Sequence, residues 1–251
     1  MAEKGLSNDE LVALRREILK EVDNNPPTIG IVGVSGVGKS STVNALFKTL
    51  LPVSHTVACT KTFTKVDLSL QFRAGQGKDL PVSLRVFDAP GLGEDIERDP
   101  PYIRMYTEAL PQCDAVIWVT AARNRAIALD QQYLRLLSAF HGRLVFGLNQ
   151  VDLVDPLNWN EKINLPSPQQ VENIDEICRD RAERFASILG REVTVTPFSA
   201  ARRYNLEEMF GSIIDSCMPK RRWVLDGLKG FHYADFLPVA IRDRFFQDQQ
   251  G

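Results

Sequence analysis

Apolar and polar positions alternate along this chain with two different periods. Short apolar runs of the kind that form buried strands occur at Thr28–Val32, Val82–Phe87, Ala115–Val119, Leu144–Leu148 and Val193–Thr196. Helical periodicity separates these runs and predicts helices over about 40–50, 127–140, 168–189 and 205–217. Strands that alternate with helices in this way indicate an α/β fold, a mostly parallel sheet with helices on both faces.

One strand is expected to run against the others. The segment Phe63–Phe72 alternates with the period of a half-buried strand and leads through Ala74-Gly75-Gln76-Gly77 into the run that begins at Val82. A Gly-rich link of this length between two strands predicts a hairpin. We therefore expect one antiparallel strand at the edge of the sheet.

Local signals mark the start of two of the predicted helices. Ser167 and Gln170 have the spacing of a capping box, and Pro168 between them suits the first helical position. Asn205 and Glu208 repeat the capping-box spacing, so we expect the same kind of cap there.

The two ends of the chain differ from its centre. Residues 1–27 are predicted to form an amphipathic helix and linker, with a capping box at Ser7 and Glu10. This helix either packs on the flank of the central domain or serves for partner binding or self-association. We expect residues 28–218 to form the α/β domain and 219–251 a helical tail. The tail, which begins with a basic and aromatic cluster, either packs on the domain or contacts a membrane or partner.

Composition narrows the classes of function. The 251 residues carry a formal net charge of -2, which gives no global basic field and no indication of nucleic-acid binding. The four cysteines lack the paired spacing of a zinc site or disulfide framework. The charged N-terminus has no signal-peptide pattern, and no apolar run approaches the ~18 residues of a membrane span. We expect a cytoplasmic protein whose contact with membranes, if any, is peripheral.

The segment Gly33–Ser40 has the pattern G-x-x-x-x-G-K-[ST] of a phosphate-binding loop, or P-loop. An apolar strand precedes it and a predicted helix follows, which is the context that this motif requires. Lys39 is expected to contact the β- and γ-phosphates, and the Ser40 hydroxyl to bind Mg²⁺. The residues expected to surround the phosphates are Gly33, Ser35, Gly36, Val37, Gly38, Lys39, Ser40 and Ser41.

A second phosphate-side motif, Asp88-Ala89-Pro90-Gly91, follows a predicted strand. A carboxylate at the carboxyl end of a parallel strand faces the ligand crevice of the sheet. We expect Asp88 to hold Mg²⁺, through a water molecule, because this ion keeps much of its hydration shell. Gly91 lacks a side chain, so its N–H group can approach the γ-phosphate.

The base-recognition segments follow two later strands. Asp152, in Asn149-Gln150-Val151-Asp152, can accept hydrogen bonds from N1–H and the 2-amino group of guanine, which adenine cannot donate in that arrangement. Ser199, Ala200 and Ala201 follow the next strand and place a backbone N–H near guanine O6. Nucleotide contacts are therefore also expected at Asn149 and Gln150.

Together these motifs resemble the TrmE–Era–septin-like superfamily of P-loop GTPases, and most closely the bacterial Era-like GTPases of poorly defined function. The resemblance covers roughly 28–218. It implies a Ras-like P-loop GTPase fold, Mg²⁺, and GTP and GDP as substrate and product. Thr60 lies twenty positions after Ser40 and matches the switch threonine of the family, which binds Mg²⁺ when GTP is present. The resemblance thus assigns catalytic roles to Lys39, Thr60 and Gly91, and metal binding to Ser40, Thr60 and Asp88.

Three residues depart from the pattern of the family. Gln150 replaces the lysine of N-K-x-D, and Gly36 stands where potassium-activated members carry asparagine. Leu92 stands where Ras-type enzymes have a glutamine that orients the attacking water. We therefore expect slow intrinsic hydrolysis that depends on a protein activator or on a homodimer. Arg123 and Arg125 are candidates to act across such a dimer, and the alternative is that they are exposed loop charges.

The function expected from the sequence is a Mg²⁺-dependent, GTP-hydrolysing molecular switch. Its role in the cell is unassigned, with assembly and stress response left open. Two alternatives remain at this stage. One is a module that binds guanine nucleotide without turnover, and the other is a nucleotide-dependent dimer or filament protein related to septins.

Overall fold

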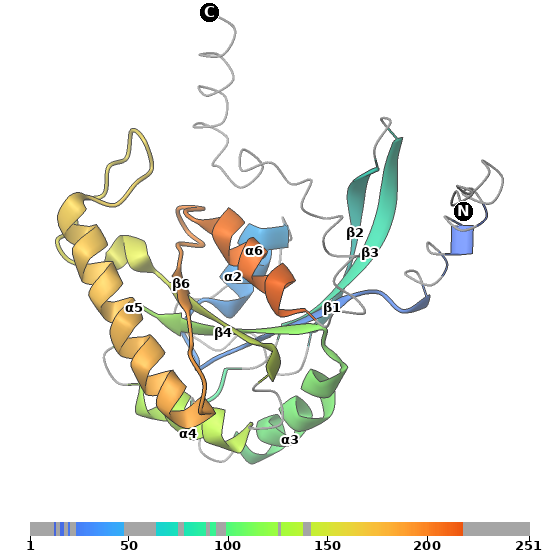
Figure 1. Ribbon diagram of the computed structural model, residues 1–251, viewed down its shortest axis with the longest axis horizontal. Coiled ribbons are helices and arrows are strands. Elements are labelled where there is room, and N and C mark those ends of the chain that lie inside the picture. The colour runs from blue at the N-terminus through green and yellow to red at the C-terminus, as the bar shows by residue number, and fades with distance from the viewer. Residues whose placement is uncertain are drawn as a thin grey trace, which may run out of the picture.

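The computed structural model shown in Figure 1 describes residues 24–47, 64–74, 78–88, 91–93, 99–124, 127–137 and 142–217, together with Ala13, Arg16, Glu17 and Lys20. Several predictions made above therefore lie outside the described residues. They are the capping box at Ser7 and Glu10, the switch threonine Thr60, Arg125, and the tail 219–251.

A six-stranded sheet forms the centre of the molecule. Its strands are β1 (Thr28–Val32), β2 (Thr64–Ala74), β3 (Lys78–Asp88), β4 (Ala115–Ala121), β5 (Leu144–Asn149) and β6 (Val195–Pro197). They lie in the order β2-β3-β1-β4-β5-β6. Five of them run parallel, and β2 pairs antiparallel with β3 at the edge, as a hairpin partner should.

Helices cover both faces of this sheet (Figure 1). They are α2 (Lys39–Phe47), α3 (Asp99–Ala109), α4 (Ala128–Leu136), α5 (Pro168–Leu189) and α6 (Leu206–Ser216), with short 3-10 turns η1 (Leu110–Gln112) and η3 (Val151–Leu153). Helices α2 and α6 lie on one face, and α3, α4 and α5 lie on the other. Within the described part of the chain, no helix is both long and apolar enough to cross a membrane.

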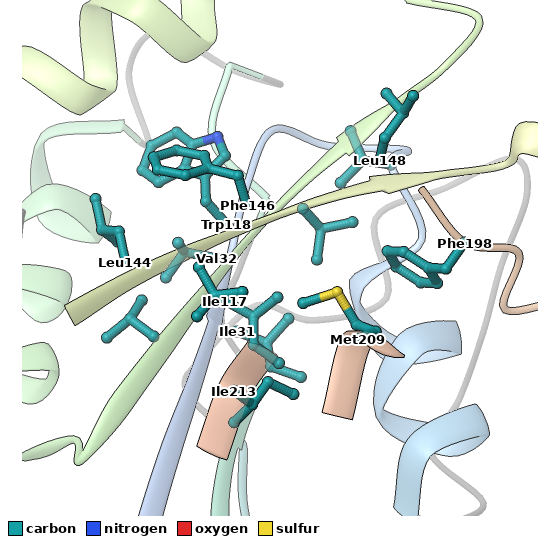
Figure 2. Close-up of a cluster of buried hydrophobic side chains, with 14 of the residues drawn as sticks. Ile31, Val32, Ile117, Trp118, Leu144, Phe146, Leu148, Phe198, Met209 and Ile213 are labelled. Carbon is teal, nitrogen blue, oxygen red and sulfur yellow. The ribbon is translucent and has the colours of Figure 1, made fainter. Parts of the chain in front are cut away.

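The core fills the space on both sides of the central strands. Every residue of β1, β4 and β5 is buried, which follows from having helices on both faces of the sheet. Figure 2 shows Ile117 beside Met209 and Ile213 of α6, while Trp118 and Phe146 lie on the opposite side of the strands. The ring of Phe146 stacks on Phe185 of α5, with centroids 4.8 Å apart.

The cap predicted for α5 is confirmed. The Ser167 hydroxyl accepts from the N–H of Gln170 at 3.3 Å, and the Gln170 side chain accepts from the N–H of Ser167 at 3.1 Å. Pro168 occupies the first turn, and Gly190 ends the helix in the left-handed conformation at φ 65°. Both ends of this helix were therefore predictable from local sequence.

The cap predicted for α6 is wrong. Asn205 adopts a left-handed conformation at φ 56° and its side chain makes no capping hydrogen bond. A capping side chain needs an extended backbone at this position, so the left-handed turn directs the amide elsewhere. The Asn205 amide instead donates to the Pro197 carbonyl at 2.9 Å and to the Glu208 carboxylate at 2.6 Å.

Helix α3 was not predicted from the sequence. Pro100 and Pro101 lie in its first turn, which suits proline because no partner is needed there for the missing N–H. Tyr106 of this helix is fully buried in the core.

The topology brings three loops to one edge of the sheet. Strands β1, β3, β4 and β5 are parallel neighbours, with Ile31 paired with Asp88 and Ala121 with Asn149. The loops that leave the carboxyl ends of β1, β3 and β5 therefore start side by side, which is where open α/β sheets bind ligands.

Candidate functional site

The P-loop leaves β1 at Gly33 and enters α2 at Lys39. Its turn requires glycine at Gly36 and Gly38, whose φ angles are 80° and 89°. A Cβ atom on Gly38 would also lie 2.5 Å from the amide nitrogen of Asn149. Glycine at this position therefore allows the loop to approach the segment that follows β5.

Two polar side chains of the P-loop are aimed across the loop and toward β3. The Lys39 ammonium group donates to the Val34 carbonyl at 3.0 Å, and only 8% of the residue is exposed. The Ser40 hydroxyl donates to Oδ2 of Asp88 at 2.7 Å. Asp88, the last residue of β3, is 2% exposed.

The hydroxyl of Ser40 and the carboxylate of Asp88 fit a magnesium ion, because Mg²⁺ prefers oxygen ligands and needs few from the protein. Within the described residues, no three His, Cys, Asp or Glu side chains form a cluster that could hold a different metal. Thr60, the third expected ligand, lies outside the described residues.

The segment after Asp88 contacts the P-loop through its backbone. The N–H of Ser35 donates to the Leu92 carbonyl at 2.9 Å, and the N–H of Leu92 faces the Gly33 carbonyl at 3.4 Å. Gly91 lies so close that a Cβ atom there would be 2.7 Å from the Cα atom of Ser35. The side chain of Leu92 is fully buried, so it is directed into the core as well as being apolar.

Asn149 connects the P-loop to the segment after β6. Its amide donates to the Val37 carbonyl at 2.9 Å, while its side-chain oxygen accepts from the N–H of Ala200 at 3.0 Å. The residue is 2% exposed. These two hydrogen bonds hold the P-loop, the segment after β5 and the segment after β6 together.

The neighbours of Asn149 complete the base side of the arrangement. Gln150 has a left-handed backbone at φ 65°, and its amide donates to the Gly36 carbonyl at 3.1 Å. One carboxylate oxygen of Asp152, Oδ1, is buried and accepts no hydrogen bond from the described residues. The Ser199 hydroxyl is buried and accepts from the N–H of Arg202 at 3.0 Å.

The structure therefore places most of the predicted site residues at one edge of the sheet. Contacts between segments join Ser40 to Asp88, Ser35 to Leu92, Gln150 to Gly36, and Asn149 to both Val37 and Ala200. Arg123 is exposed in the loop after β4.

A buried charged cluster behind the site was not indicated by the sequence. Asp130 of α4 is fully buried and accepts from the indole N–H of Trp118 at 2.8 Å. Burial raises the pKa of Asp130 to about 6, although the charges of Arg181 and Lys39 oppose the rise. Arg181 itself is 4% exposed and donates to the Asn124 carbonyl in the loop after β4. A single acidic residue in a helical stretch carries no sequence signal of such burial.

The sequence of this chain is similar to those of known proteins. The sequence profile of a family described as 50S ribosome-binding GTPase matches residues 28–150. YfjP of Escherichia coli K12, a protein of uncharacterized function, is 34% identical over 164 residues, which cover 64% of this chain and 53% of YfjP. The chain thus spans about half the length of this relative.

Solved structures show the same fold at low identity. Era of Aquifex aeolicus, bound to GDP and aluminium fluoride, matches with a TM-score of 0.54 at 18% identity, over 76% of this chain and 56% of Era. A structure of chloroplast translocon components, atToc33 and psToc159, matches with a TM-score of 0.60 at 16% identity, over 84% of this chain and 90% of its own.

The matched residues include the P-loop between β1 and α2 and Asp88 at the end of β3, and they end within the segment Asn149–Asp152 that follows β5. This chain belongs to the 50S ribosome-binding GTPase family of P-loop proteins.

Proposed function

We propose that this protein binds GTP together with Mg²⁺ and hydrolyses it to GDP and phosphate. The observation that carries the proposal is the double hydrogen bond of Asn149, which joins the P-loop to the Ser199–Ala201 segment. A phosphate cradle and a base pocket would thereby be held next to each other at one edge of the sheet.

At the phosphate end, the N–H groups of the P-loop and of the first turn of α2 bind the phosphate oxygens. The Lys39 ammonium group gives up its hydrogen bond to the Val34 carbonyl and donates to the β- and γ-phosphates instead. Ser40 and Asp88 hold Mg²⁺, which supplies positive charge to those phosphates when it is bound. Thr60 is the third proposed metal ligand, and the N–H of Gly91 is the proposed contact to the γ-phosphate.

At the base end, Asp152 accepts from N1–H and the 2-amino group of guanine. Its buried Oδ1 atom, which lacks a hydrogen-bond donor among the described residues, supports this assignment. A buried acceptor left without a donor is costly, and a guanine base would remove that cost. Since the N–H of Ala200 already donates to Asn149, the N–H of Ala201 is the donor we assign to guanine O6.

Hydrolysis is proposed to be slow without a partner. Phosphoryl transfer depends mainly on positioning and on stabilising charge, and the buried Leu92 side chain supplies neither to the attacking water. A homodimer in which Arg123 completes the site is one source of the missing charge. Dimerization is described as important for the GTPase activity of the chloroplast translocon components, which supports testing a dimer in this chain.

Equilibrium binding of GTP and ATP, followed by phosphate release at saturating GTP with Mg²⁺, tests the function. We expect binding of GTP and weak binding of ATP. Equal affinity for both nucleotides would refute guanine specificity. GTP binding without any release of phosphate, even with added protein partner, would favour the alternative that this chain binds guanine nucleotide but does not hydrolyse it.

The switch is tested by hydrogen exchange in a GTP-analogue state and a GDP state. We propose that two segments, about 52–64 and 88–100, change protection because Thr60 and Gly91 contact the γ-phosphate only when it is present. Identical protection of both segments in the two states would remove the switch from the proposal.

A further inference from the structure

A short hairpin between η3 and α5 lies against the turn that carries Ala201. The hairpin is closed by backbone hydrogen bonds between Asn160 and Leu165, at 2.9 and 3.3 Å. In the chain, this hairpin follows η3, which contains Asp152, and the Ser199–Ala201 segment comes after α5. It therefore connects the two segments proposed to read the base.

A series of hydrogen bonds runs from the hairpin into the turn. The indole N–H of Trp159 donates to the side-chain oxygen of Asn164 at 3.2 Å, and the Asn164 amide donates to the Arg202 carbonyl at 2.9 Å. The N–H of Arg202 in turn donates to the Ser199 hydroxyl at 3.0 Å. Trp159 and Asn164 are 9% and 7% exposed, so water competes little for these bonds.

An aromatic contact reinforces the series. The rings of Trp159 and Tyr204 meet edge to face, with centroids 5.2 Å apart at an angle of 89°. Tyr204 closes the turn through two backbone hydrogen bonds to Ser199, at 3.1 and 3.0 Å. The ion pair between Arg202 and Glu161 is exposed and adds little by comparison.

The backbone of the turn after β6 includes a sterically disfavoured residue, so contacts from outside the turn are needed to hold its conformation. Arg203 lies in the left-handed region at φ 54°, a conformation that is sterically disfavoured for residues with a long side chain. A backbone held in such a region persists only where neighbouring structure determines it. The hairpin supplies these contacts through Trp159 and Asn164.

From these contacts we infer that Trp159 and Asn164 are positioning residues for base recognition. They fix the turn so that the N–H of Ala201 points at guanine O6, which makes them determinants of specificity at the 6-position of the purine. This inference rests on the proposed function and names residues that set one part of its selectivity. Neither residue touches the nucleotide.

The test compares GDP with 6-thioguanosine diphosphate, in which sulfur, a weak acceptor, replaces O6. The variants are Trp159→Leu, which removes the ring and the indole N–H, and Asn164→Gly. Asn164 has a left-handed backbone at φ 54°, so glycine removes the amide while still adopting that conformation. Ile163→Ala is the matched control, because Ile163 lies in the same hairpin and is 57% exposed. Circular dichroism melting checks folding, and Asn164→Gly serves if Trp159→Leu fails to fold.

One well-placed hydrogen bond corresponds to about a fivefold difference in affinity. We expect the wild-type protein and Ile163→Ala to prefer GDP over the thio analogue by about that factor. In both variants, GDP affinity should fall about fivefold while the affinity for the analogue stays unchanged. Trp159→Phe, which retains a ring against Tyr204, should restore part of the preference.

Three results would overturn the inference. These are an equal loss of affinity for both nucleotides, unchanged affinity for both, or a wild-type protein with no preference for GDP. The first would mean that the hairpin is only a structural support. Failure of the proposed function is distinguishable, because the wild-type protein would then bind neither nucleotide.

Discussion

The base end and the phosphate end of the site are held together in different ways. At the base end, buried side-chain amides join distant segments, with Asn149 bonded to partners 112 and 51 positions away. At the phosphate end, the P-loop and the Gly91–Leu92 segment meet through two backbone hydrogen bonds, one of them 3.4 Å long.

This difference indicates what each end can do. Breaking the Asn149 bonds would leave a buried amide unpaired, so the base pocket is expected to be preformed and to stay fixed. A backbone N–H such as that of Ser35 can exchange a carbonyl for a phosphate oxygen at little cost. The contact between the P-loop and Gly91–Leu92 is therefore suited to rearrangement, and the variants below test this division.

The largest effect is expected from Lys39→Ala, which removes the side-chain charge from the phosphate end. Loss of a charged contact at a buried phosphate should weaken GTP binding by about 2–4 kcal/mol. Calorimetric titration with and without Mg²⁺ measures it, with Lys162→Ala, an exposed lysine, as control. If the two ends are independent, preference for guanine over adenine stays intact. GTP affinity equal to that of the wild type would mean that Lys39 does not contact phosphate.

Asp130→Asn is expected to stabilise the protein above neutral pH. Burial raises the pKa of Asp130 in the folded state from 3.8 to about 6. The stability contributed by its neutral carboxyl group is therefore fully present below about pH 4 and is lost as pH rises through about 6. At pH 8 the free energy of unfolding of the wild type should be about 3 kcal/mol lower than it would be without this shift. Denaturant unfolding between pH 4 and 8 measures it, with Asp175→Asn, an exposed carboxylate, as control.

The same experiment links Asp130 to the phosphate end. Because the charge of Lys39 opposes the rise in the pKa of Asp130, the Lys39→Ala background should move the transition to higher pH. If Asp130→Asn has the same pH dependence as the wild type, the buried carboxyl does not titrate in this range.

Asp152→Asn should impair recognition of the guanine base and leave the phosphate contacts intact. Loss of a charged acceptor for two guanine donors should weaken GTP binding by about 1.5–3 kcal/mol, and xanthosine triphosphate should bind better because its 2-oxo group needs a donor. Competition binding with both nucleotides measures the exchange. Asp155→Asn, an exposed carboxylate three positions later, is the control. Weaker binding of both nucleotides would argue against direct base recognition.

The smallest and least direct effect concerns Arg123. If it completes the site across a dimer, activity per molecule should rise with protein concentration, and Arg123→Ala should remove that rise while Arg135→Ala, another exposed arginine, should not. Arg125→Ala is tested in parallel. A flat, slow profile would leave an external activator. Fast turnover by a dilute monomer would refute both versions.

Sequence motifs predicted the strands and the position of the candidate site more completely than they predicted the turns. The P-loop, Asp88 and Asp152 could be placed at the same edge of the sheet because each motif follows an apolar strand, while their roles stay predictions. The cap of α5 was predicted correctly because Ser167 and Gln170 act locally. The α6 cap failed because Asn205 takes a left-handed backbone that the surrounding fold imposes. Asp130 and Trp159 could not be found, because their roles depend on contacts between segments distant in the chain.

The two hydrogen bonds of Asn149 also bear on how the protein folds. Loops that close over large sequence separations are formed late, because their entropic cost must be met before the contacts form. The chain must therefore bring β1, β5 and β6 together before Asn149 can reach Val37 and Ala200 at the same time. A nucleotide that requires this arrangement would bind only chains whose sheet is complete, so that guanine nucleotide in solution would act as a selective stabiliser of the fully folded molecule.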